Sequence, residues 1–96
     1  DQGEGVDTDY KEAMKWYLLA AKGGNKDAPN NIGVFYMIGL GVPRNFGKAH
    51  TWFTIAGAGD SEAIRNKNFV GKKLNSDQLA ESKRQAEEWR KIWLKR

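Results

Sequence analysis

A single histidine, His50, is the natural starting point for any chemistry in this 96-residue chain. One imidazole excludes a metal site with two histidines, an HExxH motif and a relay between histidines. Zero cysteines exclude disulfides, thiolate zinc sites and cysteine nucleophiles. His50 falls beside the apolar stripe of its helix, so we expect a partly exposed side chain without a catalytic role. The sequence therefore predicts no metal and no cofactor.

The carboxylates suit structural roles better than catalytic ones. Glu87 and Glu88 are adjacent, and Asp7 and Asp9 have the spacing of helix caps and solvated helix faces. General acid–base catalysis needs carboxylates that are brought together across the fold, and no spacing here favours that. We expect the chain not to be an enzyme.

Two G-x-G-V segments, residues 3–6 and 39–42, raise the question of a phosphate-binding loop. Neither continues as G-x-G-x-x-G, because Thr8 and Arg44 occupy the place of the third glycine. Neither follows a strand pattern either. We predict that both segments are turns between helices.

The basic residues raise the possibility of an anionic partner. Sixteen Lys and Arg against twelve Asp and Glu give a net charge of +4, and the excess is concentrated in the C-terminal half. Trp16 and Trp52 fall on buried stripes, and Trp89 and Trp93 share one face of the last helix, so no exposed aromatics accompany the basic residues. This pattern disfavours nucleic acid. Binding of an anionic polymer, nucleic acid or cell-wall glycan, through the basic end is kept as the second hypothesis.

Size and hydropathy limit the class of protein. The length suits one small domain, and the mean hydropathy is −0.73. No apolar run approaches the ~20 residues of a membrane-spanning helix, and the first residues lack the layout of a signal peptide. We expect a soluble chain with no membrane contact. The lack of cysteine suits oxidising and reducing compartments alike.

The elements that position these residues follow from an internal repeat. At an offset of 36, residues 3–6 align with residues 39–42, and Trp16 and Tyr17 align with Trp52 and Phe53. A fixed period of this size is typical of a solenoid, in which each unit buries its apolar face against its neighbours.

Within each unit the apolar residues have helical spacing, three and four residues apart. We predict five helices, over about 9–22, 28–38, from about 45, 61–73 and 76–94. The expected residues at their starts are Asp9, Asp27, Asn45, Ser61 and Ser76. Gly33 inside the second helix predicts close contact with the ring of Trp16 or Trp52.

Residues 25–59 resemble one complete Sel-one-like repeat (SLR), a relative of the tetratricopeptide repeats. The residues that carry the resemblance are Asp27-Ala28, Asn31-Ile32-Gly33, Tyr36, Gly39-Leu40-Gly41-Val42-Pro43, Asn45-Phe46, Lys48-Ala49, Trp52-Phe53 and Ala56. Residues 3–24 look like the second half of a truncated repeat, and residues 60–74 like a degenerate one. Residues 75–96 are similar to the C-terminal capping helix of bacterial members.

The resemblance implies an all-α fold, a single domain over 1–96 built as a right-handed α/α solenoid of antiparallel helix pairs. It implies a non-catalytic scaffold that binds a protein or peptide in its concave groove, in a bacterial cytoplasm or periplasm. The groove candidates are Asn30, Asn31, Val34, Met37, Lys67 and Val70. Some SLR proteins hydrolyse β-lactams, but those are rich in cysteine, which this chain lacks, so this activity is a remote alternative.

One further expectation concerns the N-terminal end. The chain opens on what resembles an inter-helix loop, so the helix that should precede the first one is missing. Tyr10, Trp16 and Tyr17 would then lack part of their cover. We expect a fragment of a longer array, or a homo-oligomer formed through this end.

Overall fold

The computed structural model describes residues 2–57 and 59–93, and the side chains of residues 9–57 and 59–92. These residues form five helices and no strand, with the fold 41 Å in its longest dimension. The helices are α1 (Gln2–Lys22), α2 (Ala28–Ile38), α3 (Phe46–Ala56), α4 (Ser61–Gly71) and α5 (Ser76–Trp93). The predicted all-α solenoid is confirmed.

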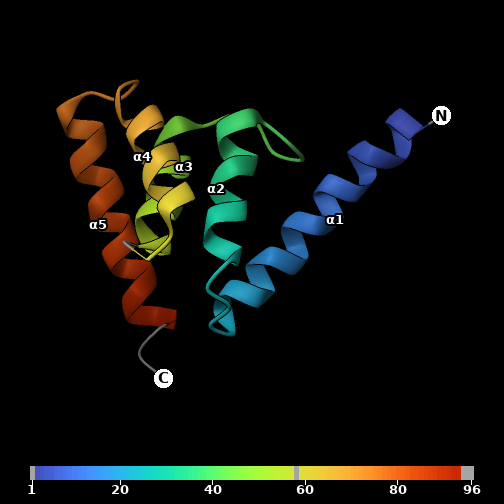
Figure 1. Cartoon of the computed structure of the whole chain (residues 1–96), viewed down its shortest axis with the longest axis horizontal. Helices are drawn as coiled ribbons and strands as arrows, with labels where there is room; N and C mark the ends of the chain where they lie inside the picture. Colours follow the sequence, from blue (N-terminus) through green and yellow to red (C-terminus); the bar gives the residue numbers. More distant parts are fainter. Residues whose placement is uncertain (1, 58, 94–96) are drawn as a thin grey trace.

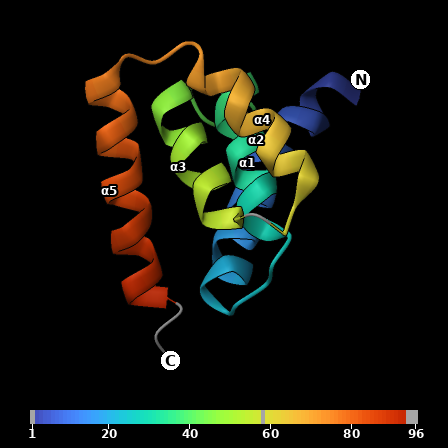
Figure 2. The same ribbon diagram turned by 60° about the vertical axis from the view of Figure 1, so that its left-hand side comes forward.

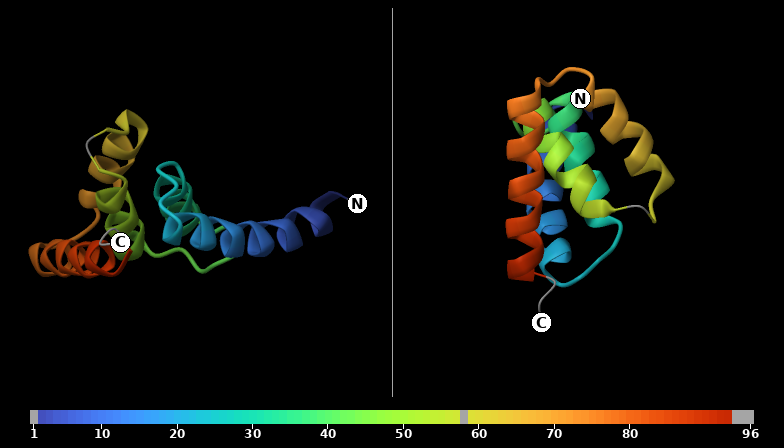
Figure 3. Two further views of the ribbon diagram at one scale, coloured as in Figure 1. Left: turned by 90° about the horizontal axis from the view of Figure 1, so that it is seen from below. Right: turned by 90° about the vertical axis from the view of Figure 1, so that its left-hand side faces the viewer.

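α3 lies at the centre of the stack. α3 packs against α2, α4 and α5, whereas α1 packs mainly against α2. Figure 1 shows α1 leaning away from α2 toward the N-terminus. Figure 2 shows α5 running alongside α3 on the other side of the stack. Seen from below, in the left view of Figure 3, α1 extends outward from the other four helices.

Two apolar clusters hold these helices together. The first joins α1, α2 and α3 through Met14, Ile32 and Trp52, with Phe35 between the rings of Tyr10 and Tyr17. The second joins α3 to α4 and contains four residues, which are Ala49, Phe53, Ala63 and Val70. Small residues such as Ala49 and Ala63 are fully buried, which lets the helix axes approach closely.

Gly33 marks the tightest of these approaches. A Cβ atom at this position would lie 2.5 Å from Cε1 of Phe53, far inside contact distance. The prediction of an aromatic ring over Gly33 is right in kind, but the ring is that of Phe53 and not of Trp16 or Trp52. The side chain of Trp16 is 61% exposed, so its predicted place in the core is wrong.

The second G-x-G-V segment forms the predicted turn. Gly39 ends α2 with φ +93°, and the N–H groups of Gly39 and Leu40 both donate to the carbonyl of Phe35. Gly41 has φ +71°, and a Cβ there would lie 2.9 Å from the backbone of Tyr10. Position 41 needs glycine both because its φ angle is positive and because the turn approaches the backbone of α1 closely.

The first G-x-G-V segment does not form the turn predicted for it. Residues 3–6 lie within α1, and so does Asp9, which is therefore not a helix cap. Glycine admits helical φ angles as readily as left-handed ones, so the same residues can continue a helix.

The other observed helix starts match the predicted ones to within a residue, but the capping residues of α2 and α5 differ. Asn25, not Asp27, accepts the first N–H groups of α2, and Asn75 with Gln78 caps α5.

Candidate functional site

An open cleft of about 950 Å³ lies at one edge of the stack. It lies where α2 and α4 begin, beside the end of α3 and the C-terminal half of α5, at the lower edge of Figure 1. Its lining is contributed by Ala21, Gly24, Asn25, Lys26, Asp27, Pro29, Asn30, Asn31, Ile55, Ala56, Gly59, Asp60, Ser61, Glu62, Trp89 and Arg90. Three separate segments of the chain, within residues 21–31, 55–62 and 89–90, therefore build one surface.

Asn30 is the notable polar residue of this cleft. It is only 6% exposed, and its side-chain Oδ1 has no hydrogen-bond partner among the described residues. A buried carbonyl without a donor costs about 1–3 kcal/mol, so such an atom is a natural acceptor for a ligand N–H. Asn31 is half-buried beside it and lines the same cleft.

Charged groups of both signs surround these amides. Lys26 and Arg90 are basic, whereas Asp27, Asp60 and Glu62 are acidic. The Asp60 carboxylate accepts the backbone N–H of Ala63 at 3.0 Å and so caps α4. The mixture suits a polar ligand that carries both donors and acceptors better than it suits an ion of one sign.

The α5 side of the cleft is held firmly. Arg90 donates from Nη2 to the carbonyl oxygen of Thr54 at 2.7 Å, which ties α5 to the end of α3. The rings of Trp52 and Trp89 lie 5.6 Å apart between centroids, also joining these two helices. The predicted structural use of Trp52 and Trp89 is confirmed, while Trp93 lies outside the described side chains.

The predicted groove residues do not form one surface. Asn30 and Asn31 line the cleft, whereas Val34 and Met37 pack against the cluster that joins α3 to α4. Lys67 lines a different cavity, described below. Val70 is 0% exposed and belongs to the core, so its assignment to a binding groove is wrong. Val70 was misassigned because the faces of a helix that remain exposed depend on where the neighbouring helices pack.

His50 is the functional candidate that sequence reasoning missed. Its side chain is buried at 5% exposed, not on the surface as predicted, and its Nδ1 is hydrogen-bonded to Ser82 Oγ at 2.5 Å. Thr51 Oγ1 lies 3.3 Å from the same Ser82 hydroxyl and 3.1 Å from the carbonyl of Gly47. The signal was available in the repeat, because His50 aligns with Met14, which is also buried.

His50 lies at a second cavity, of about 550 Å³, between α3, α4 and α5. The lining residues are His50, Lys67, Asn68, Gly71, Lys72, Leu79 and Lys83. Burial lowers the pKa of His50 below its usual value, and the charges of Lys67 and Lys83 lower it further. The imidazole is therefore held neutral by its surroundings at neutral pH.

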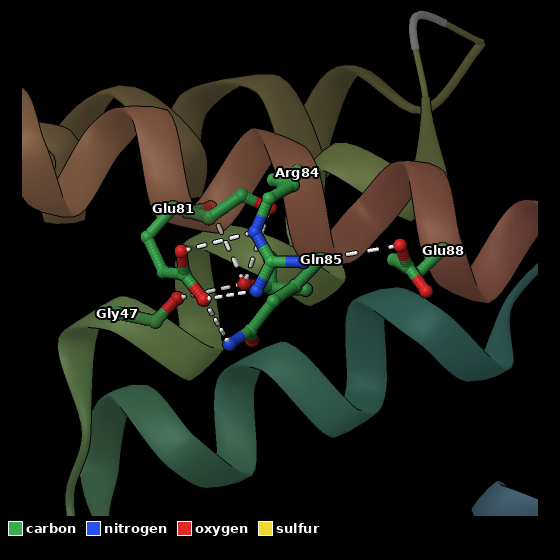
Figure 4. A network of polar contacts seen from close by, with 7 residues as sticks. Gly47, Glu81, Arg84, Gln85 and Glu88 are labelled. Atoms are coloured by element: carbon green, nitrogen blue, oxygen red, sulfur yellow. Dashed lines mark hydrogen bonds and ion pairs between the residues drawn. The ribbon is translucent and has the colours of Figure 1, made fainter.

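Two acidic residues of α5, Glu81 and Glu88, pair with Arg84 and not with the lysines of this cavity. Arg84 donates to Glu81 through Nε and Nη2, at 3.1 and 2.6 Å, and lies 3.8 Å from a Glu88 oxygen. Gln85 also donates to Glu81, and Figure 4 shows this network beside the carbonyl of Gly47. These hydrogen bonds lower the pKa of the exposed Glu81. The network pairs Glu81 with Arg84 and Gln85, and Glu88 with Arg84, so neither of these two carboxylates pairs with a lysine of the cavity.

The described residues contain neither a metal-binding cluster nor a membrane-spanning helix. No group of three or more His, Asp or Glu side chains in these ranges could hold a metal ion. No helix there is long and apolar enough to cross a membrane. One expectation about the surface needs correcting, because Phe69 is 51% exposed beneath the ammonium of Lys73, so the basic half does carry an exposed aromatic ring.

The helical stack, the glycine turn and the 36-residue period together define a helical-repeat solenoid. The Sel1 repeat family model matches residues 1–25 and 27–61, more than half of the chain. The chain belongs to the Sel1 repeat family. Such repeats typically form non-catalytic modules that mediate interactions between proteins.

One solved structure is clearly similar. It is a protective antigen present in uropathogenic Escherichia coli strains that displays an SLR fold, with a TM-score of 0.83 and 31% sequence identity. The match covers 96% of this chain and 20% of the antigen, so the chain spans about a fifth of that protein's length. A search of curated proteins returned no significant match.

Proposed function

We propose that this chain is a protein-interaction module that binds an extended peptide segment of a partner protein in the cleft between α2, α3, α4 and α5. The observation that carries the proposal is Asn30, a buried amide at the cleft whose carbonyl oxygen lacks a donor. A peptide backbone offers an N–H donor at every residue except proline and a carbonyl acceptor at every residue. An asparagine side chain can hydrogen-bond to both of these backbone groups.

The surroundings of Asn30 support a peptide over a small apolar ligand. The cleft is open, and its charged residues are of both signs. Side chains of either charge on a peptide could pair with Arg90 or with Glu62 at the rim. Because the helices are already packed, no segment of this chain has to be ordered when the peptide binds. This lowers the entropic cost of association.

Membership of the Sel1 repeat family supports the same conclusion at a coarser level, since these repeats typically mediate protein interactions. Among the described residues, no cluster of three or more His, Asp or Glu side chains could hold a metal ion. The single histidine is hydrogen-bonded to Ser82, and Glu81 is paired with Arg84.

The proposal is tested by selecting peptides from a random display library on the immobilised chain. We expect the selected peptides to bind the wild-type chain saturably and to bind Asn30→Leu at least about tenfold more weakly, because Leu removes both amide groups. Asn31→Ala should weaken binding less. Asn68→Ala, an asparagine on α4 outside the cleft, is the matched control and should bind normally. Equal binding by Asn30→Leu, with its fold verified by circular dichroism, would refute the proposal.

A second candidate is self-association through α1. Trp16 and Leu19 are 61% and 55% exposed on this helix, which packs mainly against α2. Exposed apolar residues of this size are typical of protein contacts. Sedimentation equilibrium should then show a dimer that Trp16→Ser dissociates, and a monomer at all concentrations would exclude this candidate.

A further inference from the structure

The cavity between α3, α4 and α5 lies at the opposite ends of these helices from the peptide cleft. It is formed by the end of α4, the second turn of α5 and the middle of α3. The described residues that line it include three lysines, Lys67, Lys72 and Lys83, and no carboxylate. The cavity is therefore strongly positive, in contrast to the mixed charges of the cleft.

The three lysines have no counter-ion in the described part of the chain. On α5, Glu81 and Glu88 pair with Arg84, and Glu87, four residues after Lys83, is exposed and forms no ion pair with it. Lys67 is half-buried as a residue, whereas Lys72 and Lys83 are exposed. Several unpaired cations that converge on one hollow repel one another, and an anion would relieve that repulsion.

His50 provides a directional donor at the base of this hollow. Its Nδ1 is hydrogen-bonded to Ser82, so Nε2 is the ring nitrogen left to the cavity side. A Cβ atom built on Gly71 would lie 3.8 Å from this Nε2. The Ser82 hydroxyl can donate to Nδ1 of a neutral imidazole or accept from Nδ1–H of an imidazolium. In both states Nε2 can carry a proton and donate it to an anion.

We infer that this cavity binds a phosphate group. A phosphate dianion offers the oxygen acceptors that three ammonium groups and the Nε2–H of a buried imidazole require, and lysine is a common phosphate ligand. The positively charged groups that face His50 are Lys67 and Lys72 at the end of α4 and Lys83 on α5. A bound dianion would offset the charges that now disfavour the imidazolium, so binding should raise the pKa of His50.

The test uses the side-chain NMR signal of His50, which is unambiguous because the chain has one histidine. Inorganic phosphate is titrated into the 96-residue chain near neutral pH, with sodium chloride adjusted to hold ionic strength constant. We expect a saturable shift with half-saturation on the order of 1 mM. Sulfate, which stays a dianion throughout, should raise the pH midpoint of the same signal.

Charge-matched variants decide whether the cavity is responsible. Lys83→Gln should weaken phosphate binding about tenfold, whereas Lys91→Gln, which removes the same charge from an exposed position farther along α5, should leave it nearly unchanged. Lys83 is exposed, so its loss should not unfold the chain, and a thermal melt checks this. Lys67→Gln provides an independent second variant.

Three results would overturn the inference. They are a shift that does not saturate, a shift that chloride reproduces at the same ionic strength, and equal weakening by Lys91→Gln and Lys83→Gln. The last pattern would indicate diffuse attraction of anionic polymers to the basic surface. A parallel titration with O-phosphoserine identifies the source, because tighter binding than inorganic phosphate points to a phosphorylated ligand and weaker binding to the free ion.

Discussion

Replacing Gly33 by alanine tests the packing between α2 and α3 more sharply than any other single change. A Cβ atom at position 33 would lie 2.5 and 2.6 Å from two ring atoms of Phe53, against an optimal separation of about 3.5–4.0 Å. Phe53 is 1% exposed, so its ring cannot swing into solvent. The helices must therefore separate or the ring must adopt a strained rotamer.

The size of the effect follows from two opposing terms. Alanine in a helix interior is favoured over glycine by about 1 kcal/mol. Overpacking a well-filled core costs about 1–3 kcal/mol, and the upper end applies to Gly33 because the clash is with a rigid buried ring. We expect Gly33→Ala to lower the free energy of unfolding by about 2 kcal/mol, or the melting temperature by about 8–16 °C.

The assay is urea unfolding followed by far-ultraviolet circular dichroism. Gly47→Ala is the matched control, because Gly47 is also helical and a Cβ there meets only Asn45 Oδ1 at 3.4 Å. It should be neutral or slightly stabilising. Combining Gly33→Ala with Phe53→Leu should cost less than the sum of the single changes, since leucine lacks the clashing ring atoms. A Gly33→Ala variant as stable as the wild type would refute the proposed packing.

Three further outcomes follow from the structure. The pKa of His50 is lowered in the fold, so the unfolded chain binds more protons than the folded chain near pH 6.5. The contribution of the neutral imidazole to the free energy of unfolding should therefore be fully present above that pH and be lost as the pH falls through it. His50→Gln should flatten this pH dependence in urea melts. Asn45→Ala removes the acceptor of the Lys48 N–H at the start of α3 and should cost about 1 kcal/mol in thermal unfolding. Trp89→Ala should cost about 2–3 kcal/mol by removing the contact with Trp52, whereas Ile92→Ala, at an exposed position, should change the melting temperature little.

The repeat explains why the middle of the fold could be predicted. The 36-residue period placed the turn at Gly39 and Gly41, and Asn45 marked the start of α3, because these residues satisfy local backbone needs that a short segment reveals. The same reasoning failed at residues 3–6, where glycine is compatible with both a turn and a helix. Local chemistry alone does not decide between them.

The candidate site was less predictable because it depends on tertiary placement. Helical spacing showed which residues share a face, but not which faces neighbouring helices cover, so Trp16 was expected inside and Val70 outside. His50 was expected at the surface because it falls beside the apolar stripe of its helix, yet Ser82, 32 residues away, is its hydrogen-bond partner in the interior. The cleft likewise combines helix ends that are distant in the sequence.

The most direct test of the proposed function is amide chemical-shift mapping of the chain with a selected peptide. If the cleft is the binding site, the largest changes should fall at Asn30 and Asn31 and at the start of α4, residues 60–62, and Asn30→Leu should abolish them. Changes centred instead on the exposed face of α1, around Trp16 and Leu19, would contradict the proposal.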